Sequence, residues 1–266
     1  MRFNVVGGMN LVKVLYVGDY SLEVMLELKG VELLALGNSS FDLSKHLKEA
    51  LEKEGIEVEH MPAYKAYKYF PESLDDLKRY DVLILSDIGS DTLLLYPGER
   101  RFKVPMGVNR IKLIVKYVNE GGGLIFCGGW FSFQGFRSYG NWLNTPLAKI
   151  LPVEILNTPD DRVETPEGAK PIPIDRDHPI NRGLEWESCP PFLGYNKVKR
   201  GRGKVLVELG EEKDPLVVVG EHGKGRILVF TSDPAPHWGS GFVTWKHYSR
   251  FWSQAVRWVA RSEDLT

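Results

Sequence analysis

The chain of 266 residues carries 34 Lys and Arg against 35 Asp and Glu, with 43% hydrophobic residues, and its formal net charge is -1. This composition is typical of a globular protein with a sizeable core, and it excludes attraction to nucleic acid or to an anionic membrane through a global field. No apolar run approaches the roughly 18 residues that a membrane-spanning helix needs, so we predict neither a nucleic-acid nor a membrane partner.

The two cysteines, Cys127 and Cys189, are too few to form a disulfide framework. The amino-terminal segment lacks the apolar region and cleavage site of a signal peptide, and translation could start at Met1 or at Met9. The sequence therefore predicts a cytoplasmic protein.

Strand and helix patterns alternate along the first half of the chain. Apolar runs predict strands at 11–19, 56–62, 81–89 and 123–129. Apolar residues at spacings of three and four, with capping residues and terminal glycines, predict helices at 41–55, 73–80 and 109–123. This order predicts an α/β fold in which helices cover both faces of a mainly parallel sheet.

The second half of the chain is less regular. Residues 152–200 are rich in proline and are interpreted as a loop-rich excursion within a single domain that spans 1–266. Apolar runs at 204–210 and 214–233 predict a β-meander, with the sequence EHGKG as a hairpin turn. The aromatic segment 242–262 predicts a helix docked on the sheet rather than one lying on a membrane surface.

Polar or special residues follow three of the predicted strands. Asp19 ends the first of these strands, Asp87 the third, and Cys127 the fourth, just before Gly128 and Gly129. Ligands of open α/β sheets bind beyond the carboxyl ends of the strands. The sequence therefore predicts a binding site at this edge.

Cys127 has two interpretations. As a nucleophile, Cys127 would need a base, and His237 is the candidate. Asp233 could orient His237 if the Pro-Ala-Pro segment between these two residues turns back on itself. Ile125 replaces the glycine preferred two residues before a nucleophile, and Gly239 replaces the acid often found two residues after such a histidine. As a structural residue, Cys127 is a small hydrophobe at a turn that needs glycines.

Two acidic groups are candidates for a metal site. One would form at the sheet edge from Asp19, Asp87, Asp233 and His237, and the other from acids and a histidine within 160–178. Neither contains a tight pair such as His-x-x-x-His or Cys-x-x-Cys, so we predict neither a metal nor another cofactor.

A family resemblance extends over roughly residues 12–260. The segments LYVGD, YFPESLDDLKRYDVLILSDIGSDTLLL, GGGLIFCGGWFSFQG and SDPAPHWGSGFVTWKHYSRFW occur in order. Together they resemble the glutamine amidotransferase-like proteins of unassigned function in the class I glutamine amidotransferase superfamily, which are related to ThuA-like proteins. The resemblance implies a flavodoxin-like three-layer sandwich, with Cys127 near the nucleophile of the superfamily and His237 near its base. The departures at Ile125 and Gly239 mean that glutaminase activity does not carry over directly.

We expect a small polar ligand, of a sugar or sugar-derived class, at the sheet edge. Tryptophans beside carboxylates suit such a ligand, because the ring covers its C–H face and the acids accept its hydroxyl protons. Core packing is the alternative role for the tryptophans. The expected ligand-binding residues, besides Cys127 and His237, are Asp19, Asp87, Gly128, Gly129, Trp130, Gln134, Asp233 and Trp238.

The alternative function is a thiol-dependent amidase or hydrolase. In it Cys127 attacks, His237 acts as the base, and the amide of Gly128 stabilises the oxyanion. The sequence leaves open whether the chain is an enzyme and whether it forms a homo-oligomer.

Overall fold

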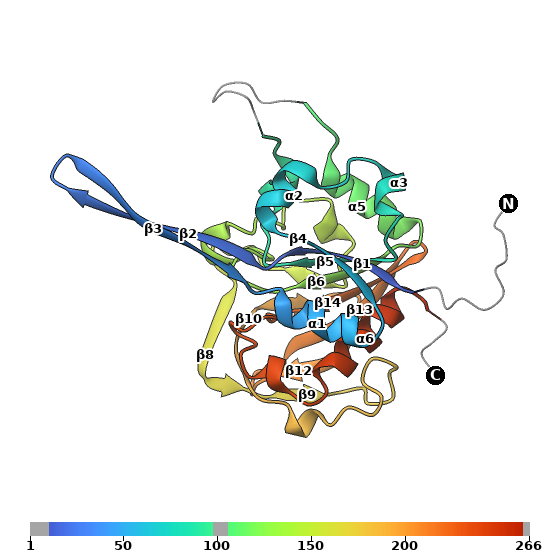
Figure 1. Ribbon diagram of the computed structural model, residues 1–266. Helices are drawn as coiled ribbons and strands as arrows, with labels where there is room; N and C mark the ends of the chain where they lie inside the picture. The colour runs from blue at the N-terminus through green and yellow to red at the C-terminus, as the bar shows by residue number, and fades with distance from the viewer. Residues whose placement is uncertain (1–10, 98–105, 263–266) are drawn as a thin grey trace.

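The computed structural model describes residues 11–97 and 106–262 and centres on an eight-stranded sheet (Figure 1). The strands lie in the order β4-β1-β5-β6-β14-β13-β12-β9. The first five of these pair in parallel: β4 (Glu57–Met61), β1 (Lys13–Gly18), β5 (Val82–Ser86), β6 (Gly123–Cys127) and β14 (Gly225–Phe230). The meander continues antiparallel with β13 (Asp214–His222), β12 (Lys204–Leu209) and β9 (Pro171–Pro173). This arrangement confirms the predicted α/β class.

Helices cover both faces of the sheet. One face packs against α1 (Lys45–Lys53) and α6 (Tyr248–Val259). The other packs against α2 (Ala63–Tyr69), α3 (Leu74–Leu77), α4 (Ser90–Leu94) and α5 (Arg110–Asn119). Because successive side chains of a strand point to opposite faces, β1 contributes Val14 and Tyr16 to the first core and Leu15 and Val17 to the second.

The predicted helix ends have local causes. Ser73 caps α3 by accepting a hydrogen bond from the backbone N–H of Asp76 at 3.1 Å. Gly55, two residues beyond α1, has a φ of +75°, which favours glycine. The predicted helix at 242–262 is in fact two pieces, a 3-10 turn at Phe242–Thr244 and then α6, so this prediction was wrong in its start.

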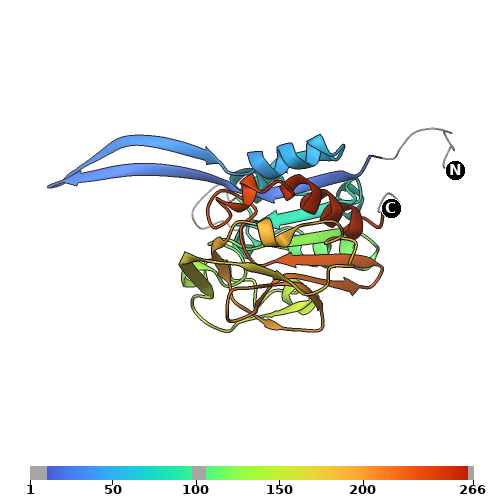
Figure 2. The same cartoon turned by 90° about the horizontal axis from the view of Figure 1, so that it is seen from below.

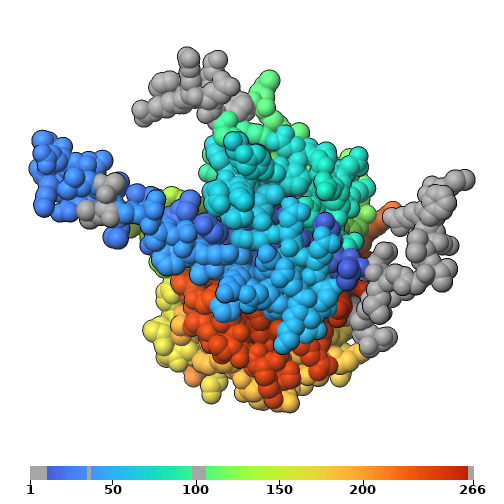
Figure 3. Space-filling model, viewed as in Figure 1, coloured from blue at the N-terminus to red at the C-terminus, as the bar shows by residue number. Residues whose placement is uncertain are grey.

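Residues 20–42 form a long hairpin that the sequence analysis did not predict. Its strands are β2 (Tyr20–Lys29) and β3 (Glu32–Asp42), and because β3 runs to Asp42 the first helix begins later than predicted. The hairpin stands clear of the layers in both ribbon views and in the space-filling view (Figures 1, 2 and 3).

The proline-rich segment forms short strands and loops, as predicted. β8 (Arg162–Ala169) pairs antiparallel with β10 (Phe192–Asn196), and β7 (Val153–Ile155) with β11 (Val198–Arg200). Short 3-10 turns at Phe136–Ser138, Leu147–Lys149 and Trp186–Ser188 complete the chain path.

None of the helices in the described part of the chain combines the length and apolar character needed to cross a bilayer. The choice between Met1 and Met9 falls on residues outside the described ranges.

Candidate functional site

The carboxyl ends of the parallel strands meet at one edge of the sheet. Gly18 pairs with Ser86, and Cys127 pairs with Phe230, so the residues that follow each strand are brought together. Asp19 and Asp87 both adopt a φ of +45° and turn the chain at this edge. The predicted edge is therefore confirmed, whereas ligand binding there stays a prediction.

Three carboxyl groups gather at this edge. Asp19 and Asp233 are each 2% exposed, and burial raises the pKa of both. The charges of Asp233 and Asp87 raise the pKa of Asp19 further. Burial, followed by the charge of Asp233, raises the pKa of Asp87 to about 7, although Asp87 accepts a hydrogen bond from the backbone N–H of Phe131 at 2.7 Å. The cluster therefore holds at least one carboxyl that titrates near neutral pH.

Asp19 belongs to the interior of this cluster. The hydroxyl of buried Tyr16 donates a hydrogen bond to its Oδ2. Asp19 Oδ1 and Ser86 Oγ are buried and have no hydrogen-bond partner among the described residues. Asp19 thus presents no exposed oxygen to the edge.

Asp233 and His237 form the pair on which the predicted base depends. The backbone N–H of Ala235 donates to Asp233 Oδ1 at 2.8 Å, and Asp233 Oδ2 lies 3.3 Å from His237 Nδ1. The Pro-Ala-Pro segment therefore turns back, as this pairing requires. Burial opposes the charged imidazole, but the hydrogen bond and the charge of Asp233 outweigh it, so the pKa of His237 is raised. Its side chain is 39% exposed.

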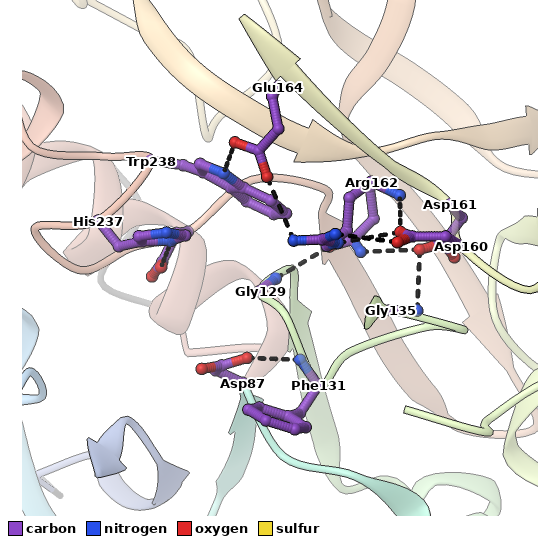
Figure 4. Close-up of polar contacts among 12 residues, drawn as sticks. Asp87, Gly129, Phe131, Gly135, Asp160, Asp161, Arg162, Glu164, His237 and Trp238 are labelled. Atoms are coloured by element: carbon purple, nitrogen blue, oxygen red, sulfur yellow. Dashed lines mark hydrogen bonds and ion pairs between the residues drawn. The ribbon is translucent and has the colours of Figure 1, made fainter. Parts of the chain in front are cut away.

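Two aromatic rings, those of Trp130 and Trp238, flank the imidazole of His237, and Trp238 is labelled beside it in Figure 4. Trp130 meets His237 edge-on at 5.6 Å between ring centroids and is 37% exposed, while neighbouring Phe131 is 41% exposed. The guanidinium of Arg162 lies 4.5 Å from the centroid of Trp130 and also 4.5 Å from that of Phe136. These contacts hold Trp130 at the edge with its ring partly open to solvent.

Cys127 lies beside the cluster but is sealed from solvent. It has no exposed surface, and burial followed by the charges of Asp19 and Asp233 raises the pKa of the thiol well above its usual range. A thiolate at this position would be desolvated and next to carboxylates.

The glycines after Cys127 do not present their amides to a ligand, which corrects the expectation that they would. Gly128 N–H donates to the carbonyl oxygens of Phe230 at 2.8 Å and Ser232 at 3.0 Å. Gly129 N–H donates to Asn196 Oδ1 at 2.9 Å. Both amides are satisfied inside the protein, so an oxyanion donor at Gly128 is not supported by this geometry.

Two further expected ligand-binding residues are buried. Trp238 is 1% exposed, and its indole N–H donates to Glu164 Oε2 at 2.9 Å. Gln134 is 6% exposed, and its side-chain oxygen accepts from the backbone N–H of Leu143 at 3.3 Å. Both side chains are therefore packed inside the protein, behind the exposed residues of the edge. Their direct contact with a ligand stays a prediction.

The sequence analysis missed the residues that clamp the loop after β6. Buried Asp161 accepts three hydrogen bonds, each of 2.9 Å, from the backbone of Gln134 and Gly135 and from the side chain of Asn196. Asn196 in turn holds Gly129. The adjacent acids at 160 and 161 suggested only metal ligands, and nothing in the sequence around Asn196 pointed to this role.

The second acidic group is dispersed among separate contacts. Asp160 pairs with Arg162 at 2.9 Å, and Asp175 pairs with Lys204 at 2.5 Å. Across residues 11–97 and 106–262, no group of three or more His, Cys, Asp or Glu side chains is arranged to hold a metal ion.

The family described as "Putative glutamine amidotransferase" matches residues 13–261. The chain belongs to this family. No curated protein sequence matches the chain.

Solved structures similar to this chain include two proteins at 37% identity. "Cytoplasmic Protein STM3548 from Salmonella typhimurium" is 37% identical over 93% of this chain and 99% of its own, with a TM-score of 0.86. "Cytoplasmic Protein STM1381 from Salmonella typhimurium LT2" is also 37% identical, with the same coverage and a TM-score of 0.83. A ThuA-like protein from Parabacteroides merdae ATCC 43184 shares the fold, at 13% identity over 94% of this chain and 90% of its own, with a TM-score of 0.53.

Proposed function

We propose that the chain is a member of this family without glutaminase activity, and that it binds a small hydroxyl-rich ligand, of the sugar or sugar-acid class, at the carboxyl edge of the sheet. One observation carries the proposal: His237 is paired with Asp233 and lies within the field of Asp87, whereas Cys127 is fully buried. The polar side chain open to solvent at the edge is thus the imidazole, with half-buried Asp87 near it, rather than a thiol.

The chemistry of these groups suits hydroxyls. A carboxyl with a pKa of about 7 is partly protonated at neutral pH, so Asp87 both accepts and donates hydrogen bonds. The exposed rings of Trp130 and Phe131 offer apolar faces for the C–H side of a sugar. Asp87, with a pKa of about 7, titrates in the range that proton transfer to or from a bound hydroxyl requires, and the raised pKa of His237 favours its protonated form.

A thiol-dependent amidase is the competing function, and two observations weigh against it. The pKa of Cys127 is raised rather than lowered, so its thiolate is disfavoured. The amide of Gly128 already donates to two carbonyl oxygens, so it is not free to stabilise an oxyanion. The contact between His237 and Asp233 is compatible with either function, and an amidase would need Cys127 and Gly128 to rearrange.

We also propose that the protein is cytoplasmic. Its two cysteines are both free and buried, as is usual in a reducing compartment. Two relatives at 37% identity are described as cytoplasmic proteins.

Replacement of the thiol tests the proposal against its competitor. We expect Cys127→Ser and Cys127→Ala to bind sugars within about twofold of the parent, because a buried, protonated thiol does not touch the ligand. The measurements are calorimetric titration with a panel of aldoses, aldonic acids and uronic acids, and release of glutamate from glutamine. Glutamine turnover by the parent that both variants lose while remaining folded would establish the amidase. Absence of binding by every member of the panel would refute the sugar class.

Replacement of the base tests the role of His237. We expect His237→Ala to weaken binding of the best sugar by about tenfold, or about 1.4 kcal/mol. We expect its melting temperature to change by no more than about 4 °C, since the side chain is partly exposed. The matched control is His46→Ala on the exposed surface of α1, which should change neither quantity. A large loss of stability with unchanged binding would show that His237 is structural.

A further inference from the structure

The hairpin of residues 20–42, called the arm below, leaves the body directly after Asp19. β2 and β3 pair along their whole length and turn at Gly30 and Val31. The backbone N–H of Leu43 donates to the carbonyl oxygen of Asp19 at 3.0 Å and closes the root of the arm. Beyond the root, the arm extends away from the layers of the body (Figures 1 and 3).

The two faces of the arm differ in chemistry. Residues directly opposite one another in an antiparallel pair lie on the same face. The pairing contains one β-bulge, whose extra residue belongs to β3, so side chains along β2 alternate between the two faces without interruption. One face carries apolar side chains that are each 59% to 75% exposed, namely Leu22, Val24, Leu26, Leu28 and Leu33. Between residues 21 and 41, all the charged side chains lie on the other face: Glu23, Glu27, Lys29 and Glu32. That charged face also carries exposed Met25, Leu34 and Phe41, and the apolar face also carries the uncharged polar residues Asn38 and Ser40.

An isolated two-stranded hairpin is only marginally stable in water. Contacts within the charged face, such as Ser39 to Glu23 at 3.4 Å and Lys29 to Glu27 at 3.9 Å, are exposed and weak. The apolar face therefore needs a covering surface. We propose that a second copy of this chain covers it, with the two arms stacked apolar face against apolar face around a twofold axis. This inference is independent of the ligand proposed above.

Self-complementarity selects a second copy as the partner. A twofold interface brings the same patch of both subunits together, and an uncharged apolar face is complementary to itself. Stacking also leaves the charged faces in water. Ten side chains from two arms, with about 100 Å² of exposed area each, bury on the order of 1,000 Å², which is the size at which specific interfaces begin.

The stack has a consequence for the site. We place the twofold axis between the two apolar faces and at right angles to the arms, which makes the two arms antiparallel. Each tip, at Gly30 and Val31, then lies near the partner's arm root, where Asp19 and Tyr20 lead into the sheet edge. The second copy is thereby placed beside the proposed ligand site.

Sedimentation of matched variants tests the interface. We expect the parent chain to sediment at twice its monomer mass of 30.2 kDa. Val24→Asp places a charge on the apolar face and should raise the dimer dissociation constant at least about 100-fold. Met25→Asp makes the same change at the next residue, with nearly equal exposure (65% against 63%) but on the charged face, and should leave the dimer intact. Circular dichroism checks that both variants are folded.

A cysteine cross-link provides a second readout that does not depend on weakening the fold. Val24 lies near the middle of the arm, so Val24→Cys should form a disulfide between two chains on oxidation, whereas Met25→Cys should not. The buried Cys127 and Cys189 should not interfere. A parent that is monomeric up to about 100 µM would overturn the proposal. Dimers that survive Val24→Asp, or cross-linking that is equal at both positions, would also overturn it.

Discussion

Gly128→Val will yield a chain that does not reach the native fold. A side chain at this position would place its Cβ 2.2 Å from the carbonyl oxygen of Thr231 and 2.7 Å from Asn196 Oδ1. Relief would require β6 and β14 to separate and the amide that holds Gly129 to move. We expect a loss of more than about 4 kcal/mol, which is a large part of the stability of an ordinary domain.

Soluble yield and urea unfolding measure this effect. Gly55→Val serves as the control, because nothing lies within 4 Å of the added Cβ there, although its φ of +75° is unfavourable. That control should cost only about 1–2 kcal/mol. A soluble Gly128→Val protein with near-parental stability would contradict the packing described at the end of β6.

Asp87→Asn will stabilise the protein increasingly as the pH rises from 5 to 8. In the folded chain the pKa of Asp87 is raised from 3.8 to about 7, so the folded state binds this proton more tightly than the unfolded state does. The contribution of Asp87 to the free energy of unfolding is therefore fully present at pH values below its unfolded pKa of 3.8. This contribution is lost as the pH rises through the folded pKa of about 7. Asparagine carries no charge and keeps an oxygen that can accept the hydrogen bond from Phe131. The variant should exceed the parent by on the order of 2 kcal/mol at pH 8 and match it near pH 4.

The comparison between variant and parent is needed because other groups titrate in the same window. The raised pKa of His237 acts in the same direction as that of Asp87, whereas burial lowers the pKa of His60 and lowers that of His178 to about 4, so those two histidines favour folding as the pH rises. Melting temperatures of both proteins across the range separate these effects. Asp91→Asn, at an exposed acid in the first turn of α4, is the control and should show no such trend. A constant difference between Asp87→Asn and the parent would rule out the raised pKa.

The local patterns of the sequence were sufficient to predict four of the five parallel strands, whereas β14 was predicted only as part of the meander. Continuous apolar runs such as Val82–Ser86 can be satisfied only by burial on both faces, and glycines such as Gly55 mark helix ends. The edge site also follows from these patterns, since parallel strands must end on the same side.

The parts that could not be predicted depend on contacts between distant residues. Whether Asp233 reaches His237 depends on a turn, and whether the amide of Gly129 is free depends on Asn196, which lies 67 residues further along the chain. From the sequence alone, Trp238 could be either a ligand contact or a buried packing residue, and its hydrogen bond to Glu164 became known only from the structure. The sequence of the arm does show apolar alternation at Leu22 and Val24 and a turn residue at Gly30. Such alternation usually indicates a strand whose apolar face packs on the core, whereas the apolar face of the arm points away from the core.

The position of β14 affects how the chain is made. β14 is the last strand in the order of synthesis, yet it lies in the middle of the sheet, between β6 and β13. Until β14 emerges from the ribosome, the strands of the nascent chain can form only two separate parts of the sheet. The edge of β6 that later pairs with β14 then has unpaired backbone groups and residues that are buried in the folded protein. Such edges recruit other strands, and non-local pairings form slowly. Chains that stop short of residue 225 are therefore expected to aggregate, and chaperone demand during translation should fall once the final segment has been released.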